Sequence, residues 1–265
     1  MGRLPGRAAR TELRRRASAV LAAARGDAPT PRPAAVRRAP TAPGRRRSNP
    51  LRVWFKQHEG RVVNKWVHYL DVYHRHFAPF RGRPVTLLEF GVNRGGSLQM
   101  WRDYLGPQAR IIGVDVDPEC AAFAAEGIEV VIGDQEDRQF LRDLVARIGP
   151  LDIVVDDGGH TMRQQIATFE EVWPAVVDGG VLVVEDLHTS YWNGYGGGLR
   201  REGTFVEYVK GLVDQLHAWH SRQPEPEVDD YTRTIRGMHV YDSIVVLDKG
   251  TVDRPRARRS GHRGR

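Results

Sequence analysis

The sequence feature that most constrains the fold is a glycine-rich turn at residues 91–96. An apolar run over 85–90 leads into it, and a helical pattern of apolar residues over 98–105 follows. This order of strand, tight loop and helix is typical of the first unit of a nucleotide-binding α/β sheet. Glycine suits the turn because the backbone has to adopt unusual φ values and let a ligand approach closely. A plain tight turn in another kind of α/β protein is the alternative.

The spacing of the glycines separates two kinds of nucleotide site. Dinucleotide sites read G-x-G-x-x-G, whereas this loop has Gly91, Gly95 and Gly96, with Glu89 just before the turn. An acidic residue, one further residue and then G-x-x-x-G is the pattern of S-adenosylmethionine (AdoMet) sites. The loop therefore favours AdoMet over a dinucleotide.

Two further strands end in polar residues suited to the same ligand. Asp115 closes the apolar run 110–114 and can accept hydrogen bonds from both hydroxyls of a ribose. A third apolar run, 128–132, leads to Asp134 and Gln135, which suit the amino group of adenine. Three strand ends in order are a more specific signal than any one of them. For Asp115 alone, the alternative is a helix N-cap before Pro118.

Strand and helix patterns alternate along the rest of the chain. Helical patterns cover 137–148, 165–177 and 204–220, and buried strands are expected at 151–155 and 181–184. Two closing strands, 233–241 and 243–247, are joined too tightly to be parallel. The predicted fold is α/β: a doubly wound, mostly parallel seven-stranded sheet of the Rossmann-like kind with an antiparallel last strand. Ligands bind such sheets outside the carboxyl ends of the strands.

The two ends of the chain differ in composition from its middle. Residues 1–49 are rich in Ala, Pro and Arg and have few large apolar side chains. They cannot bury enough surface to offset chain entropy, so a disordered arm is expected. One folded domain should cover 50–250, and 251–265 should form a disordered basic tail.

The positive charge of the chain lies in these ends. The formal net charge is +7, but residues 1–47 hold 13 Arg against Glu12 and Asp27, a net of +11, and residues 249–265 add 7 Lys or Arg against Asp253, a net of +6. Residues 48–248 therefore carry 7 − 11 − 6 = −10. An acidic domain repels a phosphate backbone, so the folded part of the chain does not predict a nucleic-acid partner.

Cysteine content and hydropathy indicate the cellular compartment of the chain. The single cysteine, Cys120, excludes an internal disulfide and fits a reducing cytosol. No apolar run reaches the roughly 18 residues that a membrane-spanning helix needs. We therefore expect a cytoplasmic protein with no membrane partner.

A helix is also expected before the glycine turn, over 64–77. Trp66, Tyr73 and Phe77 fall at helical spacing and are expected to pack this helix on the sheet. His74 and His76 are two residues apart, which does not place them on one helical face, so they do not predict a metal site. Lys65 is a single cation in front of the core and a candidate for binding a ligand carboxylate.

Acidic residues and histidines follow the fourth and fifth strands. They are Asp156, Asp157 and His160 after 151–155, and Glu185, Asp186 and His188 after 181–184. If the strands are neighbours, these carboxylates crowd one rim and raise one another's pKa unless a cation lies among them. Carboxylates without thiolates favour a hard ion, Mg²⁺ first and Mn²⁺ next. The alternative is an ordinary turn whose acids cap helices.

Four motifs together resemble the metal-dependent sugar O-methyltransferases of macrolide and antibiotic biosynthesis, of the mycinamicin VI, macrocin and rhamnosyl types. The motifs are Glu-Phe-Gly-Val-x-x-Gly-Gly-Ser, Gly-Asp-Gln, Asp-Asp-Gly-Gly-His and Glu-Asp-Leu-His-Thr-Ser-Tyr-Trp. The resemblance covers roughly residues 50–250 and implies a class I methyltransferase fold. Mycinamicin-type members carry a folded N-terminal domain that helps to form the oligomer, where this chain has a basic arm. A homo-oligomer is therefore an open expectation.

The resemblance also implies roles for individual residues. It makes Asp157, Glu185 and Asp186 the Mg²⁺ ligands and His160 the general base. Residues expected along the AdoMet site are Lys65, Glu89, Gly91, Asn93, Gly95, Ser97, Asp115, Asp134, Gln135 and Asp156. His188, Tyr191 and Trp192 are expected to contact the sugar, although burial of Tyr191 and Trp192 against the next helix is equally compatible with the sequence.

The function expected from these features is AdoMet- and Mg²⁺-dependent O-methylation of a sugar hydroxyl on a small-molecule glycoside. A divalent ion that binds neighbouring hydroxyls lowers the pKa of the attacking one, and an imidazole is suited to take the proton near neutral pH. Two alternatives remain. One is a metal-dependent methyltransferase for catechol-like molecules, and the other is a nucleic-acid-binding protein that uses the Arg-rich arms.

Overall fold

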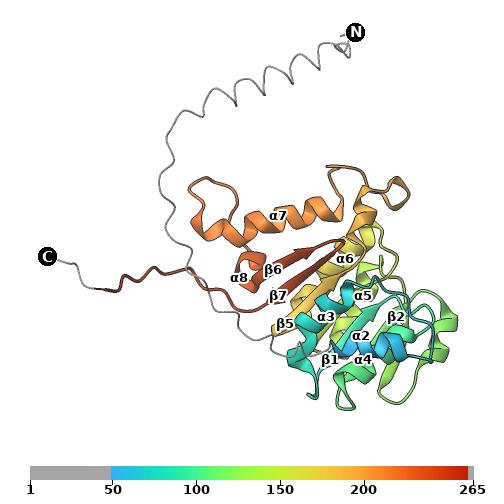
Figure 1. Cartoon of the computed structure of the whole chain (residues 1–265). Helices are drawn as coiled ribbons and strands as arrows, with labels where there is room; N and C mark the ends of the chain where they lie inside the picture. The colour runs from blue at the N-terminus through green and yellow to red at the C-terminus, as the bar shows by residue number, and fades with distance from the viewer. Residues whose placement is uncertain (1–48, 262–265) are drawn as a thin grey trace, which may run out of the picture. The chain divides into compact units, whose positions relative to one another are not determined.

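A seven-stranded sheet forms the centre of the computed structural model, which describes residues 49–261 (Figure 1). The strand order is β3-β2-β1-β4-β5-β7-β6. β7 runs antiparallel to both of its neighbours, β5 and β6, and the other pairs are parallel. The predicted doubly wound, mostly parallel sheet with an antiparallel last strand is confirmed.

The strands are short and mostly buried. They are β1 (Thr86–Phe90), β2 (Arg110–Asp115), β3 (Ile128–Ile132), β4 (Leu151–Asp156), β5 (Val176–Val184), β6 (Ile235–Tyr241) and β7 (Ile244–Lys249). The α-helices are α2 (Pro50–Gln57), α3 (Tyr69–Phe77), α4 (Gly96–Leu105), α5 (Arg138–Ile148), α6 (Met162–Val172), α7 (Phe205–His217) and α8 (Asp230–Thr234). Short 3₁₀ turns join several of them, including Leu187–Tyr191 after β5.

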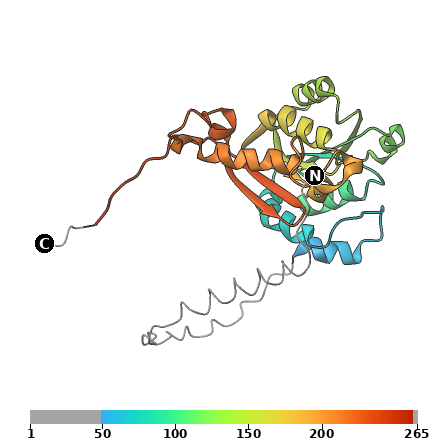
Figure 2. The ribbon, with the colours of Figure 1, turned by 90° about the horizontal axis from the view of Figure 1, so that it is seen from above.

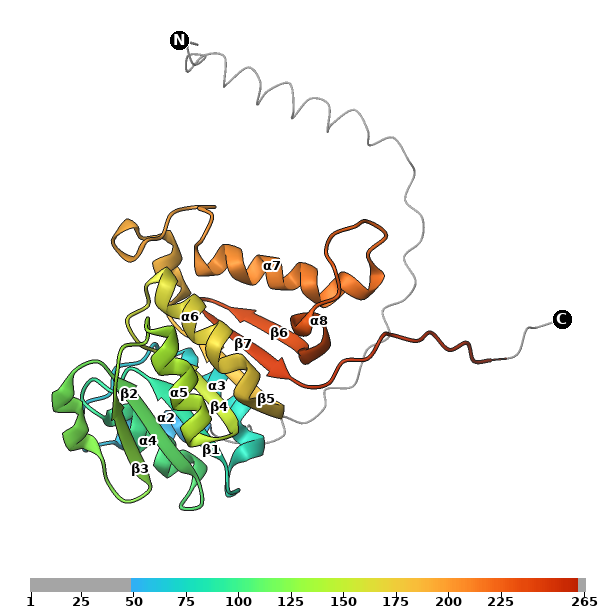
Figure 3. The same ribbon diagram turned by 180° about the vertical axis from the view of Figure 1, so that it is seen from behind.

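Helices cover both faces of the sheet because successive strand side chains point to opposite sides. Leu87 of β1 belongs to the core packed under α2, α3 and α4, whereas its neighbour Leu88 belongs to the core packed under α5, α6 and α7. Figure 1 looks onto the first layer and Figure 3 onto the second, and Figure 2 shows the sheet between them. Both cores are apolar, so chemistry is confined to the rim of the sheet.

Two helices differ from the sequence prediction. The helix expected over 64–77 begins only at Tyr69, and Trp66 is 55% exposed instead of packing on the sheet. The helix expected over 165–177 is α6, which begins at Met162 and ends at Val172. Its start is set by Thr161 and Gln164, which form a capping box that the sequence shows as T-x-x-Q.

Helix α2 was not predicted, although its start signal is present. Asn49 accepts a hydrogen bond from the Leu51 backbone N–H at 2.9 Å, and Pro50 occupies the first helical position. Asn49 also donates to the Leu70 carbonyl at 2.9 Å, which fixes α2 beside α3. The expected bounds of the folded domain, 50–250, stay a prediction.

The predicted terminal arms are only partly described. Residues 1–48 and 262–265 lie outside the described residues, so the disordered N-terminal arm stays a prediction. Residues 251–261 contain no helix or strand and are largely exposed. Within the described part of the chain, none of the helices has both the length and the apolar character needed to cross a bilayer.

Candidate active site

A cavity of about 430 Å³ opens at the carboxyl ends of the parallel strands. That volume falls in the range of small-molecule sites. Many of the residues predicted for the site line it: Gly91, Asn93, Asp115, Asp134, Gln135, Asp157, His160 and Asp186. Lys65, Glu89, Gly95, Ser97, Asp156 and Glu185 are not part of this lining. We call this space the donor cavity.

The glycine turn forms one wall of the donor cavity and is supported from below by Asp115. One oxygen of Asp115 accepts hydrogen bonds from the backbone N–H groups of Val92 and Asn93, at 2.8 and 3.0 Å. Gly91 has a φ of +93°, and a Cβ there would lie 2.0 Å from the Asp157 carbonyl oxygen. Glycine is therefore required where the turn meets the end of β4. Asp115 lines the cavity and also shapes the turn, a role that the sequence did not predict.

Gln135 is held by a buried network at the side of the cavity. Its amide donates to Asp156 Oδ1 at 2.6 Å and to Thr168 Oγ1 at 2.9 Å. Its carbonyl accepts from the Gly159 backbone at 3.2 Å. Burial raises the pKa of Asp156 to about 6. Gln135 and Asp156 thus fix the loop after β4. Asp134, the residue before Gln135, makes fewer side-chain hydrogen bonds than Gln135 does.

Glu89 lies beneath the glycine turn and is completely buried. It accepts hydrogen bonds from Ser97 Oγ at 2.8 Å and from Trp101 Nε1 at 3.0 Å. Burial, opposed by Lys65 and reinforced by Asp157, raises the pKa of Glu89 to about 7. Gly95, with a φ of +72°, is the N-cap of α4. These residues hold the turn on the sheet, and Glu89 has no face on the donor cavity.

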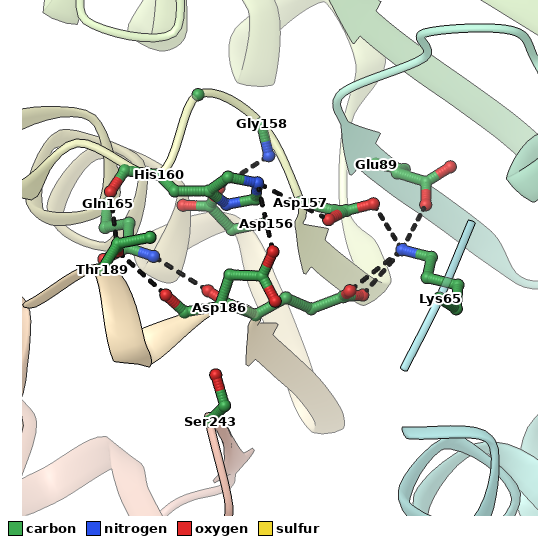
Figure 4. Close-up of polar contacts among 12 residues, drawn as sticks. Lys65, Glu89, Asp156, Asp157, Gly158, His160, Gln165, Asp186, Thr189 and Ser243 are labelled. Carbon is green, nitrogen blue, oxygen red and sulfur yellow. Dashed lines mark hydrogen bonds and ion pairs between the residues drawn. The ribbon is translucent and has the colours of Figure 1, made fainter. Parts of the chain in front are cut away.

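Lys65 is the cation of the site, but it binds the protein's own carboxylates (Figure 4). Its Nζ lies 2.5 Å from Asp157 Oδ2, 2.9 Å from Glu185 Oε1 and 3.7 Å from Glu89 Oε1. Although burial opposes the charged form, these three carboxylates raise the pKa of Lys65. Burial raises the pKa of Glu185, which also accepts a short hydrogen bond from Tyr73.

Asp157, His160 and Asp186 form a second group at the same rim. His160 Nε2 lies 3.5 Å from Asp186 Oδ2 and 3.9 Å from Asp157 Oδ1. Single ligand atoms of the three residues lie within 4.8 Å of one another, which is close enough to surround one ion. Of the three predicted metal ligands, Asp157 and Asp186 meet here, and Glu185 is paired with Lys65.

Two members of this group have strained backbone conformations. His160 and Asp186 have φ values of +56° and +55°, which non-glycine residues rarely adopt. The Tyr69 hydroxyl lies 2.9 Å from Asp186 Oδ1 and 2.8 Å from the Ser243 carbonyl. Strained residues of this kind persist where the surroundings fix them, and they cluster at functional sites.

A second cavity, of about 420 Å³, lies on the other side of these acids. Its lining is Asn64, Lys65, Trp66, Val67, Asp157, Glu185, Asp186 and His188. The two cavities share Asn64, Asp157 and Asp186. We call this space the acceptor cavity.

Aromatic rings gather at the mouth of the acceptor cavity. His188 contacts Trp192 edge-on at 4.6 Å between ring centroids and Trp66 at 6.0 Å. Tyr191 and Trp192 are each 51% exposed, so neither is buried against the following helix. Helical spacing predicted that Trp66 packs on the sheet, and that prediction is wrong. Trp66 is exposed and lines the acceptor cavity, where the sequence did not place it.

Comparison with known proteins identifies the domain built on this rim. Residues 88–187, which run from the glycine turn through both acidic strand ends, match a family model described as a methyltransferase domain. The chain carries a methyltransferase domain. This stretch contains the donor cavity and the Asp157–His160–Asp186 group.

Relatives of the methyltransferase domain confirm the resemblance that the motifs indicate. An 8-demethyl-8-(2-methoxy-α-L-rhamnosyl)-tetracenomycin-C 3′-O-methyltransferase of Streptomyces olivaceus is 41% identical over 196 residues, covering 70% of this chain and 50% of the relative. Mycinamicin VI 2″-O-methyltransferase of Micromonospora griseorubida is 35% identical over 192 residues, covering 68% and 48%. The chain spans about half the length of the relatives it matches.

Solved methyltransferase structures also resemble this chain. The MycE methyltransferase of the mycinamycin biosynthetic pathway, in complex with Mg, SAH and mycinamycin VI, superposes with a TM-score of 0.66 at 33% identity. The alignment covers 71% of this chain and 50% of that protein. A second MycE structure, with Mg and SAH, gives the same TM-score at 34% identity. The observed sheet order is therefore that of a Rossmann-like methyltransferase.

Proposed function

We propose that this chain is an AdoMet- and Mg²⁺-dependent O-methyltransferase that methylates a sugar hydroxyl of a glycosylated natural product. The observation that carries the proposal is the wall shared by the two cavities. Asp157 and Asp186 face both the donor cavity, beside the glycine turn, and the acceptor cavity, beside the aromatic rings. A methyl transfer needs the methyl group and the acceptor oxygen close together and aligned, which two adjoining cavities with shared lining residues allow.

The donor cavity suits AdoMet in both size and polarity. The glycine turn lines one side of this cavity together with two acidic residues, Asp115 and Asp134. Val116, which is 69% exposed in a cavity otherwise rich in polar groups, offers an apolar surface for the adenine ring. Relatives crystallised with SAH, and the family model over residues 88–187, support the same ligand.

The acidic rim suits a hard divalent cation. Glu89, Asp156, Asp157, Glu185 and Asp186 gather there, and among the described residues the only Lys or Arg paired with them is Lys65. Unbalanced carboxylates favour binding of a cation, and oxygen ligands favour Mg²⁺. Asp157 and Asp186 would hold the ion, with Glu185 as the third oxygen donor. A bound Mg²⁺ would lower the pKa of a sugar hydroxyl at this rim.

His160 is proposed to take the proton of that hydroxyl at Nε2. This atom faces Asp157 and Asp186 at the shared wall. The other ring nitrogen, Nδ1, is buried and has no hydrogen-bond partner within residues 49–261. An imidazole is matched to proton transfer near neutral pH.

The aromatic mouth suits a sugar. Trp66, His188 and Trp192 offer ring faces and edges beside the acids, and such surfaces bury the apolar face of a deoxysugar while the acids bind its hydroxyls. Rhamnosyl and mycinamicin substrates in the names of relatives support a glycoside. We therefore favour sugar hydroxyls over a catechol.

The test is methyl transfer by the full chain to a panel of rhamnosides, other deoxysugar glycosides and simple diphenols, with AdoMet and MgCl₂. Product with one added methyl group is expected from a glycoside and not from its aglycone. Asp157→Asn should yield no product and still bind SAH. Methylation of diphenols alone would favour the catechol alternative, and no methylated product from any acceptor would contradict the proposal.

A further inference from the structure

A second group of metal-ligating side chains lies outside the active site, between α3 and the β6–β7 hairpin. It consists of His76, His239 and Asp248, and single ligand atoms of the three lie within 4.8 Å of one another. His239 Nε2 is 2.9 Å from Asp248 Oδ2, and His76 Nδ1 is 4.0 Å from Asp248 Oδ1. The two imidazole centroids are 4.6 Å apart. We call this group the His–His–Asp cluster.

The fold brings these residues together from distant parts of the sequence. On the hairpin, His239 pairs with Val246, and Gly237 pairs with Asp248. Residues two apart on a strand share a face, so His239 and Asp248 lie diagonally on the same side of the sheet. Val246 belongs to the core that α3 covers, so this is the side on which His76 lies. Sequence spacing alone, which compared His76 with His74, could not find the cluster.

The carboxylate of the cluster has few partners. Asp248 is 22% exposed, and in the described part of the chain it pairs with the two histidines and with no Lys or Arg. Arg75, the nearby cation, contacts the ring of Tyr241 instead. Partly buried carboxylates are normally paired or bound to a metal.

The geometry of His76 leaves one ring nitrogen directed at the cluster. Its Nε2 is 2.9 Å from the Tyr241 hydroxyl, which can hold the ring in place. Its Nδ1 is too far from Asp248 for a hydrogen bond. A hydrogen bond to one ring nitrogen while the other faces an ion is the usual arrangement of a metal-binding histidine. The His76 side chain is 7% exposed, so the ring is held by its surroundings.

We propose that His76, His239 and Asp248 bind a divalent transition-metal ion, Zn²⁺ in preference to Mg²⁺. Bonds of about 2.0–2.2 Å to nitrogen and oxygen place two ligands of one zinc ion roughly 3–4 Å apart, so the cluster needs only a small contraction. Two imidazoles and one carboxylate suit Zn²⁺, whereas Mg²⁺ favours oxygen ligands. The fourth position, on the side of the more exposed His239, is left for water.

Such an ion would tie α3 to the hairpin that supports the active site. α3 carries Tyr69 and Tyr73, whose hydroxyls contact Asp186 and Glu185. The hairpin turn carries Ser243, which contacts Tyr69 and His188. The ion is therefore structural: it is expected to stabilise the fold and has no part in methyl transfer, so the inference does not depend on the proposed function.

The experiment is calorimetric zinc titration of the untagged full chain after removal of metal, with the thermal midpoint measured in parallel. His239→Ala and Asp248→Asn, both at partly exposed positions, are compared with the wild type. His217→Ala, an exposed histidine on α7, is the matched control. The wild type and the control should bind one more equivalent of zinc than either cluster variant, and zinc should raise their midpoints further.

Zinc that binds at the Asp157–His160–Asp186 group is common to all four proteins and cancels in this comparison. Titration with Co²⁺, followed by its visible absorption, gives a second measurement: the absorption should be weaker in His239→Ala than in the wild type and in His217→Ala. Equal zinc stoichiometry and equal midpoint shifts in the wild type and both cluster variants would overturn the proposal.

Discussion

The ammonium group of Lys65 and the carboxylate of Glu185 form a buried ion pair, with Nζ 2.9 Å from Oε1 and side-chain exposures of 2% and 1%. Glu185 was expected to bind a metal ion, and Lys65 was expected to bind a ligand. The pair places a protein cation against Asp157 and Glu185, two of the three acids that the resemblance assigns to Mg²⁺. Lys65 is therefore an internal counter-ion of the acidic rim.

Replacing Lys65 tests this role. Lys65→Met leaves buried carboxylates without their cation, and such changes cost about 3–5 kcal/mol of stability. In EDTA the variant should melt at a lower temperature than the wild type, and MgCl₂ should raise its midpoint by more than it raises that of the wild type. Lys210→Met, at an exposed ion pair, is the control. Equal responses to Mg²⁺ in all three proteins would refute the counter-ion role.

His160 is expected to act on the rate and not on cofactor binding. His160→Asn is the preferred variant because asparagine tolerates the left-handed backbone at this position. Loss of a general base should lower kcat by about 10²–10⁴, while SAH affinity measured by calorimetry stays unchanged. A turnover number close to that of the wild type would remove His160 from proton transfer.

Glu89 should make stability depend on pH. Its pKa is raised from 4.5 to about 7 by burial, so the folded state binds more protons than the unfolded state between these values. The contribution of Glu89 to the free energy of unfolding is fully present below pH 4.5 and is lost as the pH rises toward 7. Relative to that of Glu89→Gln, the free energy of unfolding of the wild type should fall by up to about 1.4 kcal/mol per pH unit in this range.

Urea unfolding of both proteins in EDTA, from about pH 5 to about pH 7.5, measures this difference. A constant difference across the range would show that Glu89 has an ordinary pKa in the folded protein. A wild type that gains stability relative to the variant as the pH rises would reverse the predicted sign.

Trp66 is expected to contribute to acceptor binding. Trp66→Ala removes a ring beside His188 and should raise KM for a glycoside roughly three- to tenfold, which corresponds to about 0.5–1.5 kcal/mol for one ring contact. SAH affinity should not change, because Trp66 does not line the donor cavity. Steady-state kinetics with Val240→Ala, an exposed apolar residue outside both cavities, supplies the control. An unchanged KM would place the sugar elsewhere.

The sheet and the positions of its polar ends could be predicted because they depend on local patterns. Apolar runs of strand length, the glycine turn and a tight final hairpin specify the order of elements and the antiparallel β7. Ligand position follows from the rule that strand ends share one rim. Asp157, His160 and Asp186 meet there as expected.

Side-chain partners could not be predicted because they depend on contacts between distant segments. Lys65 lies 120 residues from Glu185 in the sequence, and no spacing rule relates them. Glu89 precedes the glycine turn, yet its hydrogen bond with Trp101 holds it in the core, away from the donor cavity. Gln135 lines the cavity, and its amide is at the same time bound to the buried Asp156. Trp66 has helical spacing with Tyr73, but the chain becomes helical only at Tyr69.

The most direct test of the proposed active site is the metal dependence of methyl transfer by the wild type and by Asp157→Asn. Turnover of a glycoside with AdoMet should stop in EDTA and return when MgCl₂ is added in excess, and Asp157→Asn should remain inactive under both conditions while it binds SAH normally. Full turnover in EDTA, or an Asp157→Asn variant as active as the wild type, would contradict a metal-dependent reaction at the acidic rim.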